Sequence, residues 1–88
     1  MKTLDIEAVQ AFVLTTDLKS FTRAAKAMDT TQSTVSLKIK RLEKGLGHRL
    51  LERTPRQVRL SADGTAFLEP ARKLVAAHQG AINAFGTG

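Results

Sequence analysis

The 88-residue sequence contains no cysteine, no tryptophan and no tyrosine, and only two prolines. Without cysteine the chain can form no disulfide, and it offers no thiolate for a metal site or for redox chemistry. Four phenylalanines are its only aromatic residues. It therefore lacks the set of aromatic rings on which single-stranded RNA-binding proteins stack bases. These absences exclude disulfide scaffolds and argue against RNA binding.

The sequence also lacks long apolar runs and the motifs of common enzymes. No run approaches the length of a membrane span, and the N-terminus MKTLDIEAV has no signal-peptide core. A glycine-rich phosphate loop, paired carboxylates in an apolar setting and a nucleophile–histidine signature are all missing. His48 and His78 lie thirty positions apart, and we expect no metal site. We expect a cytoplasmic, bacterial-type protein that is not an enzyme and uses no cofactor.

Acidic residues are scarce, and the excess positive charge is confined to one segment. The chain has 14 basic and 8 acidic residues, a net charge of +6. Residues 38–59 contain only two acidic residues beside eight basic ones, which are Lys38, Lys40, Arg41, Lys44, Arg49, Arg53, Arg56 and Arg59. This segment alone therefore carries a net charge of +6. Such a patch on one small domain favours a polyanion partner over an ordinary solvated surface.

Two helices are predicted in the first third of the chain. Asp5 is a good N-cap for the first helix. Its apolar stripe, at helical spacing, consists of Ile6, Val9, Phe12 and Val13. Residues 17–20 indicate a break, after which Ser20 caps a short helix over residues 21–28. Two adjacent alanines in this second helix permit close approach of another helix.

A third helix, residues 31–45, follows a tight turn at Asp29–Thr31. Thr31 can cap it, and Gly47 suits the left-handed position after its end. Its apolar face consists of Val35, Ile39, Leu42 and Leu46. The opposite face consists of Ser33, Leu37, Lys40, Arg41 and Lys44. Solvation explains the cations on that face, but it does not explain the leucine among them.

Beyond Gly47 the apolar residues no longer recur at helical spacing but at every second position, which predicts a small hairpin. Residues 49–53 and 57–60 form its two strands, with a proline-containing turn and arginines at the tip. Ser61 then caps a long final helix, which Pro70 should bend or weaken, and the closing FGTG should be frayed. We expect a mainly α fold: a winged helix-turn-helix over residues 1–61, followed by a linker and dimerisation helix over residues 62–86.

These elements carry motifs that resemble the N-terminal DNA-binding domain of LysR-type transcriptional regulators. The matching segments are SFTRAAKAM (20–28), TQSTVSLKIKRLEKGLG (31–47), LLERTPRQVRLSADG (50–64) and FLEPARKL (67–74). The resemblance implies sequence-specific binding to double-stranded DNA, and dimerisation through the final helix. It also implies a small-molecule-binding domain beyond that helix, which these 88 residues lack, so we expect a fragment. The alternative is a winged-helix domain of another regulator family.

The resemblance assigns DNA contacts to the third helix and to the wing. In the helix, the residues are Gln32, Ser33, Thr34, Ser36 and Leu37; in the wing, they are Arg53 and Arg56. Leu37 departs from the family pattern, in which arginine, glutamine or another polar residue is common. Leucine can form no hydrogen bond with a base, but it can contact a thymine methyl group.

Each of these contacts has a structural alternative. Gln32 can pair with the N6 and N7 atoms of adenine or contact a phosphate, and it can instead bond its own backbone. The hydroxyls of Ser33, Thr34 and Ser36 can reach DNA or satisfy the free amides of the first helical turn. We expect Lys38, Lys40, Arg41 and Lys44 to neutralise phosphates. Arg53 and Arg56 are candidates for the minor groove, with Arg59 a weaker one.

The final helix carries an apolar seam with alternating spacings of three and four residues. Its members are Leu68, Ala71, Val75, His78, Ile82 and Phe85. We predict that this seam joins two copies of the chain, with a tetramer as the alternative for the full-length protein. In the competing interpretation the helix packs on its own domain. A homodimer implies an inverted-repeat operator. We expect no membrane partner.

Overall fold

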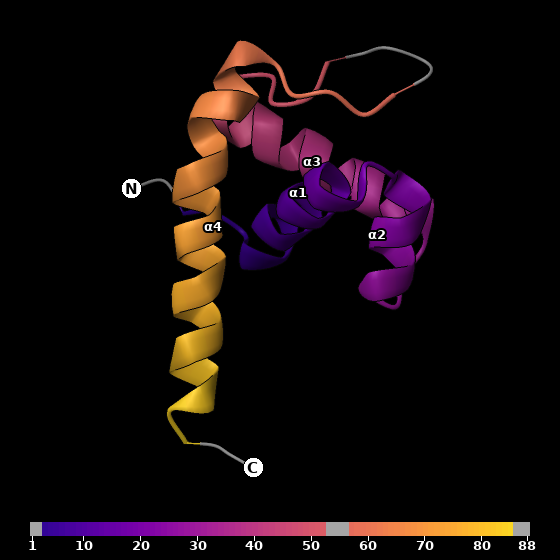
Figure 1. Cartoon of the computed structure of the whole chain (residues 1–88). Helices are drawn as coiled ribbons and strands as arrows, with labels where there is room; N and C mark the ends of the chain where they lie inside the picture. The colour runs from indigo at the N-terminus through magenta and orange to yellow at the C-terminus, as the bar shows by residue number, and fades with distance from the viewer. Residues whose placement is uncertain (1–2, 53–56, 86–88) are drawn as a thin grey trace.

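The computed structural model describes residues 3–52 and 57–85 of the chain (Figure 1). Within them lie four helices: α1 (Ile6–Leu18), α2 (Phe21–Ala27), α3 (Gln32–Leu46) and α4 (Ala62–Asn83). Each predicted N-cap is confirmed, because its side chain accepts a hydrogen bond from a backbone amide of the first turn. These caps are Asp5, Ser20, Thr31 and Ser61. Local capping chemistry thus fixes where every helix begins.

A residue in the left-handed conformation follows each of the first three helices. Gly47 adopts the predicted left-handed conformation at the end of α3, with φ of +75°. Asp29, in the turn between α2 and α3, has φ of +55°. The predicted break at residues 17–20 is too long, because α1 continues through Leu18 and ends at Lys19, where φ is +54°. The break is therefore confined to two residues.

Helix α1 is the centre of the domain and packs against α2, α3 and α4 (Figure 1). The ring of Phe12, fully buried on α1, lies 5.7 Å from the ring of Phe67 on α4. The predicted apolar stripes of α1 and α3 both face this core. Their buried members are Val9, Phe12, Val13, Val35, Ile39 and Leu42. Ala24 and Ala25 are also buried, as expected for close approach of α2.

The two predicted wing segments pair in antiparallel fashion. Leu51 and Leu60 form an isolated bridge, and the amide of Glu52 donates to the carbonyl of Arg59 at 2.8 Å. In the described part of the wing the pairing is limited to this bridge and does not extend into a strand of several residues. The predicted tip, residues 53–56, lies outside the described residues.

A buried carboxylate joins α3 to the base of the wing. Glu43 is only 7% exposed, and its Oε2 accepts hydrogen bonds from the amides of Leu50 at 2.8 Å and Leu51 at 3.1 Å. Charged carboxylates are buried only where hydrogen bonds or charges compensate them. The pattern of the sequence did not predict this contact.

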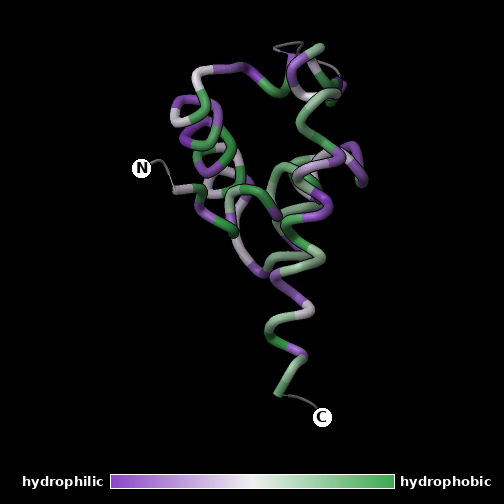
Figure 2. Tube along the Cα trace, turned by 90° about the vertical axis from the view of Figure 1, so that its left-hand side faces the viewer, coloured by the Kyte–Doolittle hydropathy of each residue, from purple (hydrophilic) through white to green (hydrophobic). Residues whose placement is uncertain are grey.

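Helix α4 runs unbroken through Pro70, and its second half extends beyond the other helices (Figures 1 and 2). Its first half is held to α1 by the ring contact of Phe67 and by an ion pair. In that pair both terminal nitrogens of Arg72 donate to the carboxylate of Asp17, one at 2.9 Å. The fork-to-fork geometry adds directional specificity to the packing of α4 on α1.

This ion pair predicts a pH-dependent contribution to stability. Hydrogen bonding to Arg72 lowers the pKa of the Asp17 carboxyl below its usual value. The pair therefore stabilises the fold above the unfolded-state pKa of Asp17, and this contribution is lost as the pH falls through the lower folded-state pKa. Arg72→Met should slightly lower the urea midpoint at pH 7 and leave it unchanged in strong acid. Lys73→Met, which removes the same charge from α4, should show no such difference between the two pH values.

Candidate nucleic-acid interface

The polar face of α3 is exposed, opposite the face that enters the core. Five of the predicted contact residues line one shallow hollow on this face: Gln32, Ser33, Ser36, Leu37 and Lys40. Leu37 is 47% exposed and lies among the polar residues. The helix begins at a fixed cap and is anchored by its buried stripe, so these five side chains project from a rigid element. The structure thus brings half of the predicted DNA-contact residues together on one surface.

The polar side chains at the start of α3 have different partners. Gln32 does not bond its own backbone. Its Oε1 accepts a hydrogen bond of 3.1 Å from the hydroxyl of Thr22 on α2. Thr34 bonds to the cap of its own helix, because its amide donates to the hydroxyl of Thr31 at 3.1 Å and its own hydroxyl lies 2.9 Å from the same oxygen. The side-chain amide of Gln32 therefore bonds to α2, whereas the hydroxyl of Thr34 bonds to the cap of α3.

The basic residues of α3 also divide into two groups. Lys40, Arg41 and Lys44 are exposed. Lys38 is turned toward α1, with its Nζ 3.0 Å from Oε1 of Glu7 and its side chain only 24% exposed. This ion pair engages the ammonium group of Lys38, for which we predicted a contact with phosphate. Because Glu7 precedes Lys38 by thirty-one positions, the local pattern contains no signal for the pairing.

The predicted wing contacts are only partly described. Arg53 and Arg56 lie outside the described residues. Arg59 is exposed, and its Nε donates to Oε1 of Gln57 at 3.2 Å.

Within the described part of the chain, no cluster of histidine and acidic side chains could hold a metal ion. None of the helices in residues 3–52 and 57–85 is both long and apolar enough to cross a membrane.

The predicted seam of α4 is divided by the domain itself. Leu68, Ala71 and Val75 face the core of their own chain, and Ala71 is completely buried there. His78 is half-buried. Only Ile82 and Phe85 at the end of the seam are largely exposed, at 56% and 97%. The first half of the seam therefore follows the competing interpretation, in which the helix packs on its own domain.

A second apolar stripe lies beside that seam on α4. Its members recur at spacings of three and four, and all are exposed: Ala66, Pro70, Leu74, Ala77, Ala81 and Phe85. We call these residues the α4 stripe. The same periodicity is visible in the sequence, but the predicted dimer face is the neighbouring seam, which has larger side chains. In the structure the seam is the inner of two adjacent apolar faces, and the α4 stripe is the outer one.

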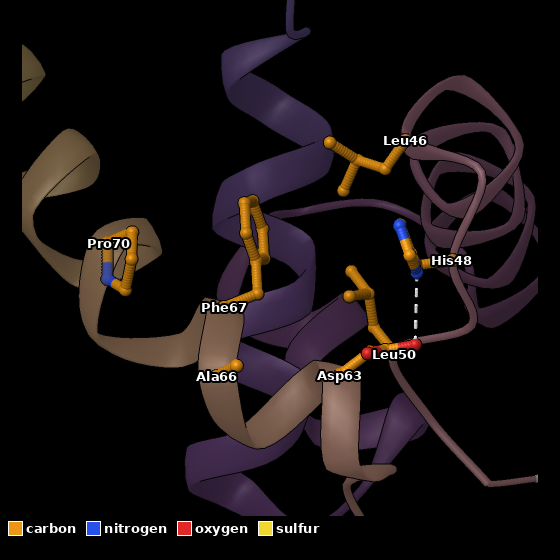
Figure 3. A pocket seen from close by; sticks show the side chains of 7 residues that line it. All are labelled: Leu46, His48, Leu50, Asp63, Ala66, Phe67 and Pro70. Carbon is orange, nitrogen blue, oxygen red and sulfur yellow. Dashed lines mark hydrogen bonds and ion pairs between the residues drawn. The ribbon is translucent and has the colours of Figure 1, made fainter.

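An apolar groove meets the start of the α4 stripe. It lies between the end of α3, the base of the wing and α4, and is lined by Leu46, His48, Leu50, Asp63, Ala66, Phe67 and Pro70. Figure 3 shows Phe67 and Leu50 inside this groove, with His48 and Asp63 joined at its edge. The Nδ1 of His48 lies 3.1 Å from Oδ2 of Asp63. The groove extends the apolar surface of the stripe onto the helix-turn-helix.

Comparison with known sequences identifies relatives of the whole helix-turn-helix. Residues 6–65 match the family model described as "Bacterial regulatory helix-turn-helix protein, lysR family". An SDS degradation transcriptional activation protein from a Pseudomonas species is 45% identical over 71 residues, which are 81% of this chain and 23% of that protein. An HTH-type transcriptional repressor of Pseudomonas aeruginosa is 41% identical over 70 residues, covering 80% of this chain and 22% of the relative.

Solved structures with the same fold include complexes with DNA. The BenM DBD bound to catB site 1 DNA has a TM-score of 0.84 at 31% identity, covering 92% of this chain and 91% of that one. The CbnR DBD–DNA complex has a TM-score of 0.83 at 28% identity, covering 92% and 93%. The chain spans less than a quarter of the two curated relatives described above. It has the winged helix-turn-helix architecture of these domains, and it belongs to the LysR family of bacterial regulatory helix-turn-helix proteins.

Proposed function

We propose that this chain binds double-stranded DNA in a sequence-specific manner, as the DNA-binding part of a transcriptional regulator. One observation carries the proposal: α3 buries its apolar face in the core and presents an amide, hydroxyls, a leucine and cations on the other. A helix fits the major groove of B-DNA, which is about 12 Å wide and displays a distinct pattern for each base pair. The DNA complexes of two structural relatives with the same fold support DNA binding by this chain.

The exposed residues of α3 divide into readers of bases and binders of phosphate. We assign base contacts to Gln32, Ser33, Ser36 and Leu37, and phosphate contacts to Lys40, Arg41 and Lys44. Thr34 supports the cap and Lys38 supports the packing of α3 on α1, because their polar groups are already paired there. Arg53 and Arg56, which lie outside the described residues, remain our candidates for the minor groove.

The salt dependence of binding tests this proposal. Log K falls as log salt rises, and each phosphate contact that is lost should make this slope shallower by about 0.9. Lys40→Gln removes one such contact and should therefore make the slope shallower by about 0.9. Lys73→Gln on α4 removes the same charge away from α3 and should leave the slope unchanged. Equal slopes for the two variants, or tighter binding to single-stranded RNA than to duplex DNA, would contradict the proposal.

Leu37 yields a separate prediction about a single methyl group. If it packs against a thymine methyl in the major groove, replacing that thymine with uracil should weaken binding by about 1 kcal/mol, as expected for one buried methyl group. Leu37→Ala should bind the thymine and uracil sites equally. The measurement is fluorescence anisotropy on operators with one thymine replaced at a time. Unchanged affinity at every replaced position would remove Leu37 from the interface.

We further propose that the α4 stripe joins two copies of the chain in an antiparallel pair. Pro70 and Phe85 lie equally far from the midpoint between Ala77 and His78, and so do Leu74 and Ala81. A two-fold axis at that midpoint would therefore set large side chains against small ones. It would also bring Phe85, which is 97% exposed, to the apolar groove of the other copy. Two α3 helices related in this way require an inverted-repeat operator.

A further inference from the structure

The hydroxyl of Thr22 and the side-chain amide of Gln32 link α2 to the start of α3. Thr22 lies in the first turn of α2, two positions after its Ser20 cap, and Gln32 is the first residue of α3. The hydroxyl donates to Oε1 of Gln32 over 3.1 Å. Both side chains are exposed, so neither is needed to fill the core. Two residues ten positions apart thus meet on the surface assigned to DNA.

This hydrogen bond restricts a side chain that would otherwise be mobile. A glutamine side chain has three rotatable bonds, and fixing it costs conformational entropy when it binds a partner. Threonine is branched at Cβ and is stiff about its first side-chain torsion, so it is a fixed anchor point. Because α2 is packed on both α1 and α3, the position of that anchor is set by the core.

The bond leaves the amide able to contact a base. An amide oxygen has two acceptor sites and the nitrogen has two donors. After the bond from Thr22, one acceptor site and both donors remain. Pairing with the N6 and N7 atoms of adenine requires one acceptor and one donor. The contact therefore orients the carboxamide without consuming the groups that would recognise adenine.

We propose that Thr22 is a positioning residue that sets sequence preference at one base pair by holding the amide of Gln32. The inference rests on the proposed DNA binding by α3, and it adds a residue of α2 that acts on specificity through Gln32. Holding one side chain in advance of binding is worth about a two- to tenfold gain in affinity. The gain should apply only to the base pair that Gln32 prefers.

The test uses the 88-residue chain and a set of duplexes that differ at one base pair. Selection from random duplex DNA first gives the preferred site, and Gln32→Ala identifies the base pair that Gln32 reads. Thr22→Val removes the hydroxyl but keeps the shape and the branched Cβ. Thr22→Ser keeps the hydroxyl. Thr65→Val is the matched control, because Thr65 is also near a helix start and its hydroxyl donates locally, to the carbonyl of Ser61 at 3.1 Å.

We expect Thr22→Val to lower affinity for the preferred base pair by about two- to tenfold and to leave the other three base pairs unchanged. Thr22→Ser and Thr65→Val should keep the wild-type preference. In the Gln32→Ala background, Thr22→Val should have no further effect. Thermal unfolding of Thr22→Val should match that of the wild type.

Two results would overturn the inference. One is an equal loss on all four base pairs, which would make Thr22 a phosphate contact or a stability residue. The other is an undiminished effect of Thr22→Val in the Gln32→Ala background, which would show that Thr22 acts independently. Failure of the proposed function is distinguishable from both, because the wild type would then select no preferred site.

Discussion

Leu74→Glu combined with Ala81→Glu is expected to lower affinity for a two-half-site operator by about 10²- to 10⁴-fold, while affinity for a single half-site stays at the wild-type value. The loss is of this size because joining two binding modules raises affinity through effective concentration, without any new DNA contact. Both residues belong to the α4 stripe, and both are exposed on the chain by itself. The antiparallel pairing would place each glutamate beside the glutamate of the other copy. Fluorescence anisotropy on full and half operators measures the difference, and analytical ultracentrifugation reports the oligomeric state.

The polar face of the same helix provides a matched control. Ala76→Glu with Asn83→Glu adds the same two charges at the same seven-residue spacing, on residues outside both apolar faces. This control should remain dimeric and retain full-operator affinity. A glutamate at Val75 would be a poor probe, because Val75 packs against the core. A wild-type chain that is monomeric on operator DNA would refute dimerisation through the stripe.

Gly64→Ala is expected to destabilise the fold by about 3 kcal/mol, the upper end of typical overpacking costs. A Cβ at Gly64 would lie 1.9 Å from the carbonyl oxygen of Leu50 and 2.8 Å from its carbonyl carbon. These are backbone atoms, and they cannot move aside freely. The same oxygen accepts a hydrogen bond of 2.9 Å from the amide of Ser61. The amide of Leu50 donates to Glu43. Equilibrium unfolding in urea measures the loss.

Gly80→Ala is the control for this prediction. Gly80 is also in α4, but beyond the backbone of its own helix a Cβ there would have no atom of the described residues within 4 Å. Alanine costs less backbone entropy than glycine in a helix, so this variant should be more stable than the wild type by about 0.5–1 kcal/mol. If Gly64→Ala were equally stabilising, the close packing of α4 against the base of the wing would be wrong.

The order of helices could be predicted because its determinants are local. Ser20, Thr31 and Ser61 each cap a helix through an oxygen and an amide three residues apart. The end of α1 was misplaced for the opposite reason. Asp17 has a low intrinsic preference for a helix, but its carboxylate pairs with Arg72, fifty-five positions away. Tertiary contact overrides a weak local preference there.

The candidate site was predictable to a similar degree. Helical spacing alone placed Leu37 and Lys40 on the exposed face of α3. It could not show that Lys38 pairs with Glu7 or that Gln32 bonds to Thr22, because those partners come from other helices. On α4, periodicity found an apolar face but could not decide which of two adjacent faces the domain itself covers. That choice depends on how α1 packs, which no local pattern records.

The buried carboxylate of Glu43 has a consequence for local opening. The amides of Leu50 and Leu51 donate to a side chain carried by α3, so their hydrogens can exchange with water only when α3 and the base of the wing separate. Regions that open together behave as one cooperative unit. Helix α3 and the base of the wing therefore share one opening free energy, and in the proposed complex with DNA they would act as a single rigid body.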